Sequence, residues 1–271
     1  MTYLVLRIAV VLSLVSACLR GDVESVFICV LVLVLFMIPG FIQKNFGIEM
    51  PSALEIIILC FIFAAEIMGE LQCFFIKYQH WDTMLHTTNG FICAAVGFSL
   101  IDILNRNRKA DMKLSPFFVV LFGFCFSMTI GVLWEFFEFF SDCFLHTDMQ
   151  KDTVIHLISS VALDKTNSNV PVIISGITNT AVNGQELGLG GYLDIGLFDT
   201  MEDLLVNFIG AVVFSIFGYY YLKGRDKARF VGDLLIRMKD DGEPPEKPAE
   251  AIPAEVGTGP GESNDTAGKT V

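Results

Sequence analysis

The sequence has little charge for its length. Lys, Arg, Asp and Glu make up 18% of the 271 residues, whereas about a quarter is usual in a soluble domain. Hydrophobic residues make up 53%, and the mean hydropathy is +0.59. This composition argues against a soluble enzyme and against a nucleic-acid-binding protein.

Two further patterns are missing. The seven cysteines form no Cys-x-x-Cys pair and no regular spacing, so we interpret them as small core residues rather than a disulfide framework. Gly188, Gly190 and Gly191 have no strand–helix context, and no Lys-Ser or Lys-Thr follows them. They therefore do not indicate a nucleotide-binding loop.

Long apolar runs dominate what is present. Six of them are long enough to cross a bilayer, which takes roughly 17–25 residues in a helix. They cover Tyr3–Leu19, Ser25–Phe41, Ser52–Ile76, Thr83–Leu104, Ser115–Phe140 and Phe198–Leu222. The sequence predicts an all-α, polytopic membrane bundle of about six transmembrane helices over residues 1–222.

The orientation follows from the basic residues, which gather on the cytoplasmic side of membrane proteins. They are concentrated between the fourth and fifth runs (Arg106, Arg108, Lys109, Lys113) and after the sixth (Lys223, Arg225, Lys227, Arg229, Arg237, Lys239). Both places lie on one side of a six-span chain. We therefore expect cytoplasmic termini and an external loop at residues 141–197.

The first run has a second interpretation. Arg7, the apolar stretch Ile8–Val15 and the residues Val15-Ser16-Ala17-Cys18 are similar to a bacterial lipoprotein signal. Cleavage before Cys18 would leave five spans and an acylated external N-terminus. The sequence leaves both interpretations of residues 1–17 open.

Three segments outside the spans differ in composition. In the external loop, Val170–Ser175 and Ile177–Val182 are rich in β-formers and flank Ser175-Gly176, which favours a small hairpin. Residues 223–239 form a basic amphipathic segment, expected at the cytoplasmic membrane surface or as a continuation of the last span. Residues 240–271 contain eight acids, two bases and five of the nine prolines, which predicts a disordered acidic tail.

Acidic residues gather at the external end of four spans. They are Glu66 and Glu70, then Asp82 with His86, then Glu135, Glu138 and Asp142, and finally Asp199, Glu202 and Asp203 with Asn207. Spacings of three and four place each set on one helix face. Because charges within spans usually face the bundle interior and mark function, we expect a shared, outward-facing carboxylate–histidine cavity.

This cavity lacks matching positive charge. Fourteen acids lie on the external side between Glu66 and Asp203, against Lys77, Lys151 and Lys165. Clustered carboxylates must then share protons or bind a cation. One histidine among carboxylates favours Mg, Mn or Ca, with Zn as a further candidate.

The candidate site residues follow from these faces. The predicted metal ligands are His86, Glu66, Glu70, Glu135, Glu138, Asp199 and Asp203. Asn207, Asp142 and Gln150 complete the polar cavity, and Glu135, His86 and Asp82 are the candidate catalytic residues. Glu138, Asp142 and Glu202 also fit as interfacial residues facing water, and Trp134 fits an aromatic belt.

Several of these residues carry a resemblance to a known family. The segments Trp81-Asp82-Thr-Met-Leu-His86-Thr-Thr-Asn-Gly90, Gly131-Val-Leu-Trp134-Glu135-Phe-Phe-Glu138 with Asp142, Asp148-Met149-Gln150, Gly196-Leu-Phe-Asp199-Thr200-Met201-Glu-Asp203 and Asn207-Phe-Ile-Gly210-Ala211 resemble the YjdF-type family of bacterial membrane-spanning proteins. The resemblance covers roughly Glu66 to Leu222. It implies a helical bundle in the bacterial cytoplasmic membrane and no particular reaction.

Three functions remain open from the sequence. The first is a metal-assisted enzyme acting on lipid head groups or lipid-linked envelope substrates, with Glu135 as general base. The second is a proton- or cation-coupled transporter of a small polar solute, which with six spans would work as a homodimer. The third is a non-catalytic sensor or assembly factor, whose acidic tail recruits a cytoplasmic partner.

Overall fold

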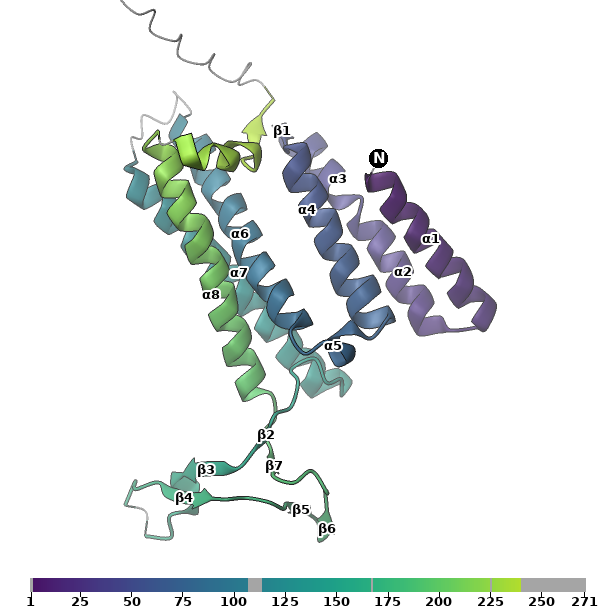
Figure 1. Cartoon of the computed structure of the whole chain (residues 1–271), viewed down its shortest axis with the longest axis vertical. Coiled ribbons are helices and arrows are strands. Elements are labelled where there is room, and N and C mark those ends of the chain that lie inside the picture. Colours follow the sequence, from purple (N-terminus) through teal and green to yellow (C-terminus); the bar gives the residue numbers. More distant parts are fainter. Residues whose placement is uncertain (1, 107–113, 167, 225, 240–271) are drawn as a thin grey trace, which may run out of the picture. The chain divides into compact units, whose positions relative to one another are not determined.

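Six helical segments long and apolar enough to cross a membrane form most of the protein. The computed structural model describes residues 2–106, 114–166, 168–224 and 226–239, so the predicted acidic tail lies outside the described residues. The helices are α1 (Thr2–Arg20), α2 (Val23–Leu35), α3 (Ile38–Phe46), α4 (Ser52–Ile62), the π-helix η1 (Phe63–Leu71), α5 (Phe74–Lys77), α6 (Trp81–Arg106), α7 (Pro116–Leu145) and α8 (Leu197–Leu222) (Figure 1). The predicted helical membrane class is confirmed.

Two of the spans have irregular geometry that the apolar pattern does not show. The second span, Val23–Phe46, breaks between α2 and α3, because Pro39 lacks an N–H and crowds the carbonyl four residues earlier. The third span continues from α4 into η1 and stops at Leu71. It does not reach Ile76, since Cys73 adopts a left-handed conformation with φ 58°.

The helices pack as two groups, each with its own core, and a third apolar cluster that includes Leu54 on α4 and Ile92 on α6 joins them. In the N-terminal half, which comprises α1 to η1, the core is formed by buried apolar side chains: Val10, Cys29, Val32, Phe36, Leu59 and Ile67. In the C-terminal half, α6, α7 and α8 pack against one another around Phe98, Val119 and Phe214. Helix α6 is the most buried of the six spans.

Glycines allow α6 and α8 to approach closely. A Cβ added at Gly90 would clash with the backbone carbonyl of Asn207, and one at Gly210 would clash with the carbonyl of Thr87. Small residues at such crossings let helix backbones come into contact within a membrane. The same crossing places His86 on α6 and Asp203 on α8 at the level of the outer helix turns.

The segment after the last span folds back onto the helices. Helix α8 ends before Gly224, which has φ 71°, and a 3-10 helix η3 (Asp226–Asp233) and strand β8 (Arg237–Met238) follow. Strand β8 pairs antiparallel with β1 (Ile48–Glu49), and the Ile236 amide donates to the Ser99 hydroxyl on α6 at 3.1 Å. The predicted continuation of span six as a helix is therefore wrong.

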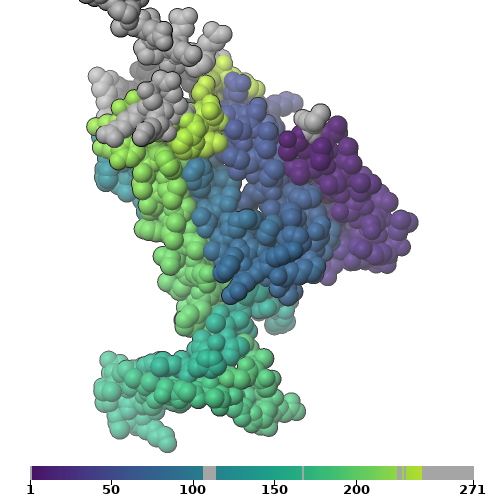
Figure 2. Space-filling view, viewed as in Figure 1, coloured from purple at the N-terminus to yellow at the C-terminus, as the bar shows by residue number. Residues whose placement is uncertain are grey.

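A lobe of short strands separates α7 from α8 and projects beyond the helix ends (Figures 1 and 2). Its elements are β2 (Val154–Ile155), β3 (Leu157–Ser160), η2 (Val161–Leu163), β4 (Val172–Ser175), β5 (Ala181–Val182), β6 (Gln185–Glu186) and β7 (Tyr192–Leu193). Strand β3 pairs with β4, β5 with β6, and β2 with β7.

The hairpin expected between residues 170–175 and 177–182 is wrong in its pairing. Ser175-Gly176 does not form its turn, because β4 pairs with β3 instead. The tight turn lies at Asn183-Gly184, where both residues have positive φ, 53° and 80°. Asn-Gly is the preferred sequence of a two-residue hairpin turn, and it joins β5 to β6.

Candidate functional site

Five ionisable side chains from three helices meet at the end of the C-terminal half from which the strand lobe departs. Asp82 and His86 lie one turn apart on α6, Glu135 and Glu138 one turn apart on α7, and Asp203 on α8. We call these five residues the acidic cluster. His86, Glu135, Glu138 and Asp203 are each at most 7% exposed, which confirms that the helical spacing turns them inward.

The two nitrogens of the His86 ring face different carboxylates. Nε2 lies 3.5 Å from Asp82 Oδ1 and 3.7 Å from Asp203 Oδ2, and Nδ1 lies 3.9 Å from Glu135 Oε1. Metal-bound histidines commonly direct the ring nitrogen that does not bind the metal at a carboxylate. Nε2 and the two aspartates therefore form a candidate ligand set on one side of the ring, and Glu135 faces the other ring nitrogen.

The two glutamates of α7 are short of partners. The side chains of Thr200 and Gln150 interact with Glu135, although neither of its oxygens makes a hydrogen bond of standard geometry. Oε2 of Glu138 has no hydrogen-bond partner within the described residues. The other oxygen of Glu138 accepts from the Trp134 indole N–H at 2.9 Å. Buried carboxylate oxygens without partners are costly, and in the part of the chain that the structure describes no Lys or Arg forms an ion pair with any residue of the acidic cluster.

The acidic cluster contains two overlapping sets of potential ligands. Asp82, His86 and Asp203 bring one ligand atom each to within 4.8 Å of one another, and Glu135, Glu138 and Asp203 do the same. Neighbouring ligands of a tetrahedral ion such as Zn lie roughly 3.3 Å apart, and those of a six-coordinate Mg roughly 3 Å. The measured His86–aspartate separations exceed these values only slightly, so small side-chain movements suffice to close on an ion.

Comparison with known proteins gives a family for this chain. Residues 1–224 match the model of a family described as a predicted membrane protein, DUF2238. The chain belongs to this family. It is also 28% identical over 114 residues to a Thermotoga maritima protein described as uncharacterized. That match covers 41% of this chain and 57% of the relative, so the chain spans little more than half the length of the relative it matches. No solved structure matches.

In this DUF2238 chain, the other predicted cavity residues have structural roles around the cluster. Asp142 accepts the backbone amides of Met149 and Gln150 at 2.7 and 2.8 Å. These two hydrogen bonds hold in place the segment that connects α7 to the lobe. The Gln150 side chain donates to the Thr200 hydroxyl, and both of these side chains lie beside Glu135. Asp199 accepts the Lys151 amide at 2.8 Å.

Asn207 closes the cavity on the membrane side. It is fully buried, and its Oδ1 accepts from the Asn89 amide at 3.2 Å. Its own amide points at the Met128 sulfur at 3.6 Å. Below it, Ala94, Phe98 and Phe214 belong to the apolar core of these DUF2238 helices, and this core separates the acidic cluster from Ser99 and Asp102, which are buried further along α6.

Glu66 and Glu70 stand apart from the cluster. Both lie on η1, where Glu66 is half-buried and Glu70 is exposed. Neither belongs to a set of ligand atoms within 4.8 Å among the residues that the structure describes. Glu70 is close enough to Asp82 for their charges to interact. Their predicted role as ligands therefore stays a prediction.

The sequence does not predict two polar contacts of the acidic cluster, those made by Trp134 and Thr200. Trp134 fits the aromatic belt because it is 42% exposed, but its indole N–H also orients Glu138. The spacing of four residues along α7 was the available signal. Thr200 reaches the cluster from the first turn of α8, and no periodic pattern marks it.

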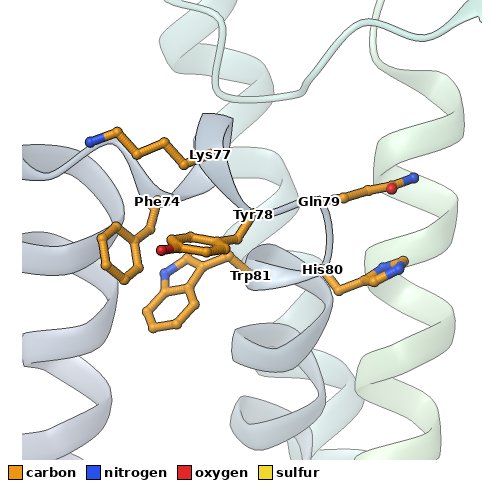
Figure 3. A pocket seen from close by; sticks show the side chains of 6 residues that line it. All are labelled: Phe74, Lys77, Tyr78, Gln79, His80 and Trp81. Carbon is orange, nitrogen blue, oxygen red and sulfur yellow. The ribbon is translucent and has the colours of Figure 1, made fainter.

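A pocket of about 480 Å³ lies at the turn that leads into α6. It is lined by Phe74, Lys77, Tyr78, Gln79, His80 and Trp81 (Figure 3). Figure 3 shows Phe74, Tyr78 and Trp81 gathered together, with Gln79 and His80 pointing away from them. Phe74 and Trp81 meet edge to face at 4.9 Å, and Trp81 precedes Asp82. The pocket is therefore an aromatic surface beside the cluster.

Outside the spans, two aspartates of the connecting loop differ in their pKa. Burial, with Asp148 and Asp194 nearby, raises the pKa of Asp152 above its ordinary value. Hydrogen bonds from Thr166 and Ser168 hold the pKa of Asp164 well below its ordinary value. His156 belongs to the lobe and not to the acidic cluster. Its Nδ1 lies 2.8 Å from the Ile177 carbonyl oxygen.

Proposed function

We propose that this membrane protein is a divalent-cation-dependent hydrolase that acts at the external surface of the bacterial cytoplasmic membrane. One ion binds Asp82, His86 and Asp203, and the substrate is a lipid head group or a lipid-linked envelope compound. The finding that supports the proposal most directly is the buried Oε2 of Glu138, which has no hydrogen-bond partner among the described residues and lies in a cluster of four carboxylates.

The charge of the acidic cluster requires a cation or several protons. Four carboxylates lie around a single imidazole, and no ion pair with Lys or Arg offsets them within the described residues. Carboxylates and one imidazole are the donor set that Mn, Mg, Ca or Zn accept in proteins. If the carboxylates are instead neutralised by protons and no cation binds, the cluster fits the proton-coupled transporter.

Each residue then has a chemical role. A bound ion makes its water a stronger nucleophile and polarises a phosphoryl or acyl oxygen. Glu135 lies with Oε1 3.9 Å from His86 Nδ1 and would take the water proton on Oε2. The water oxygen bonds to the phosphoryl or acyl centre while the bond to the leaving group breaks. Glu138 adds negative charge that strengthens cation binding.

The depth of the cluster supports a substrate at the membrane surface. Asp82 and Asp203 lie in the first two turns of α6 and α8, where head groups meet the hydrocarbon region. The aromatic pocket at Trp81 lies beside them, and aromatic rings favour this interface. A cation site also supplies the positive charge that a phosphate group needs, which the few nearby lysines do not.

Transport fits the structure less well. The apolar core around Phe98 and Phe214 interrupts the polar residues beyond Asn207 and Asn89, and Ser99 and Asp102 are buried further along α6. Clustered acids can still serve a proton relay or a cation site, so hydrolase activity that depends on the metal, rather than metal content alone, distinguishes the enzyme from the transporter. The third candidate, a sensor or assembly factor, predicts that the acidic cluster can be mutated without loss of function.

The test is elemental analysis of the full chain, purified in detergent without chelator, alongside a phosphatase and esterase screen on lipid substrates. We expect a stoichiometric divalent metal that His86→Ala removes together with any activity. His80→Ala is the matched control, since His80 is exposed and lies outside the cluster. A metal-free protein that added Mn, Mg, Ca and Zn do not stabilise would overturn the proposal.

A further inference from the structure

The acidic cluster is larger than one ion needs. Its two ligand sets share only Asp203, and each contributes two further residues from one helix: Asp82 and His86 from α6, Glu135 and Glu138 from α7. A carboxylate has two oxygens and can bind one cation with each. Asp203 on α8 is therefore placed to bridge an ion on the α6 side and an ion on the α7 side.

A second observation points to a ligand on the α7 side. Glu135 has a side chain that is 5% exposed, and its only recorded polar partners besides His86 are the neutral side chains of Thr200 and Gln150, neither in standard hydrogen-bond geometry, among the described residues. Glu138 is 7% exposed, and Trp134 holds its Oε1 while Oε2 stays buried and free. An indole that fixes one carboxylate oxygen and leaves the other unused is how a partner residue orients a metal ligand.

We infer that the cluster holds two divalent cations, bridged by Asp203. The first ion is the one assigned above to Asp82, His86 and Asp203, so the inference rests on the proposed function. The second binds Glu135, Glu138 and Asp203. Two cations also balance the four carboxylates of the cluster around a neutral imidazole, whereas one ion leaves two negative charges buried without compensation.

The two sites differ in their preferred metal. The first combines an imidazole nitrogen with two carboxylates and suits Mn or Zn. The second has oxygen ligands only and suits Mg, Mn or Ca. Mn fits both sites, which makes it the probe for the experiment. In two-metal hydrolases the ions are about 3.5–4 Å apart and stabilise the attacking and leaving oxygens together.

A second ion changes what Glu135 does. With Oε2 bound to a cation, Glu135 no longer takes the proton of the attacking water. A water shared by two cations loses its proton more readily than a water bound to one. Glu135 is therefore a metal ligand in the two-ion state and the proton acceptor only in the one-ion state.

The test is to count Mn per chain in the full-length protein in detergent, loaded with manganese chloride and freed of excess. We expect two Mn in the wild type, one in Glu138→Gln and none in Asp203→Asn. Glu202→Gln is the matched control and should keep two, because Glu202 is an exposed acid next to Asp203 on the same helix. The electron paramagnetic resonance spectrum of the wild type should show two spin-coupled Mn, and that of Glu138→Gln an isolated one.

Trp134→Phe gives a milder variant that keeps every carboxylate. We expect roughly tenfold weaker binding of the second Mn and unchanged binding of the first, because loss of an orienting partner typically weakens metal affinity by about 10–100-fold. One Mn per chain in the wild type, unaffected by Glu138→Gln, would overturn the second site and leave the proposed function intact. No bound Mn at all would overturn the two-ion inference, and the proposed function would fall with it only if added Mg, Ca and Zn also fail to bind.

Discussion

The two halves of the bundle are both built from apolar helices, more strongly apolar on average in the N-terminal half, and they have different interiors. The N-terminal half buries Val10, Val32, Phe36 and Leu59, and its helices need no special contact to stay together. The C-terminal half buries four ionisable side chains at one end and joins α6 to α8 through glycines. Length and hydropathy therefore identify a span, while the residues on its inward face show whether it supports the bundle or forms a site.

Glycine substitution should separate the two halves most strongly. We expect Gly90→Ala to lower the apparent melting temperature in detergent and to abolish cation binding, because its Cβ would clash with the Asn207 carbonyl. Overpacking of this kind costs about 1–3 kcal/mol or more. Gly40→Ala in α3 is the control, since nothing lies within 4 Å of its Cβ position. Equal melting temperatures for the two variants would contradict the close crossing of α6 and α8.

Neutralising a buried carboxylate should have opposite effects with and without metal. In chelator, we expect Glu135→Gln to melt at a higher temperature than the wild type, because it removes a buried charge that has no oppositely charged Lys or Arg partner among the described residues. Burial of one charge costs roughly several kcal/mol, and neutral Gln avoids part of this cost. With Mn present, the wild type should gain stability and the variant should gain less. A variant that is less stable than the wild type in chelator would show that Glu135 has a compensating partner.

The smallest effect concerns the external lobe, far from both cores. The pKa of Asp164 is lowered by hydrogen bonds from Thr166 and Ser168, so its carboxylate stabilises the turn above its ordinary pKa, and this stabilisation is lost only as pH falls through the lower folded value. We expect the Thr166 and Ser168 amides to stay protected from hydrogen exchange between pH 7 and pH 4. Asp164→Ala should lose that protection at every pH in this range. Loss of protection in the wild type near pH 5 would contradict the lowered pKa.

The sequence predicts the span count and most of the acidic cluster for the same reason. Apolar runs of fixed length mark the helices, and spacings of three and four place Asp82 with His86 and Glu135 with Glu138 on inward faces. The same rule fails where the backbone departs from a regular α-helix. Glu66 and Glu70 lie on a π-helix, and they do not join the ligand sets that the structure describes.

The sequence alone does not predict the role of residues that act through a hydrogen-bond partner. Asp142 has the same helical spacing as Glu138, yet it accepts backbone amides of the following loop. Trp134 looked like a membrane-interface residue, and only the structure shows its contact with Glu138. The β-rich runs predict the lobe hairpin at the wrong position. Asn183-Gly184 is a local turn signal in the sequence, and it marks the turn that the structure contains.

The pairing of β1 with β8 has a consequence for how the protein is made. These strands join a segment near the start of the chain to the last described residues, and the Ile236–Ser99 hydrogen bond adds to the same connection. A ribosome delivers β8 only after all six spans have been synthesised. The β1–β8 connection between the halves is therefore made only on the completed polypeptide, whereas the apolar cluster of Leu54 on α4 and Ile92 on α6 involves helices that are synthesised earlier.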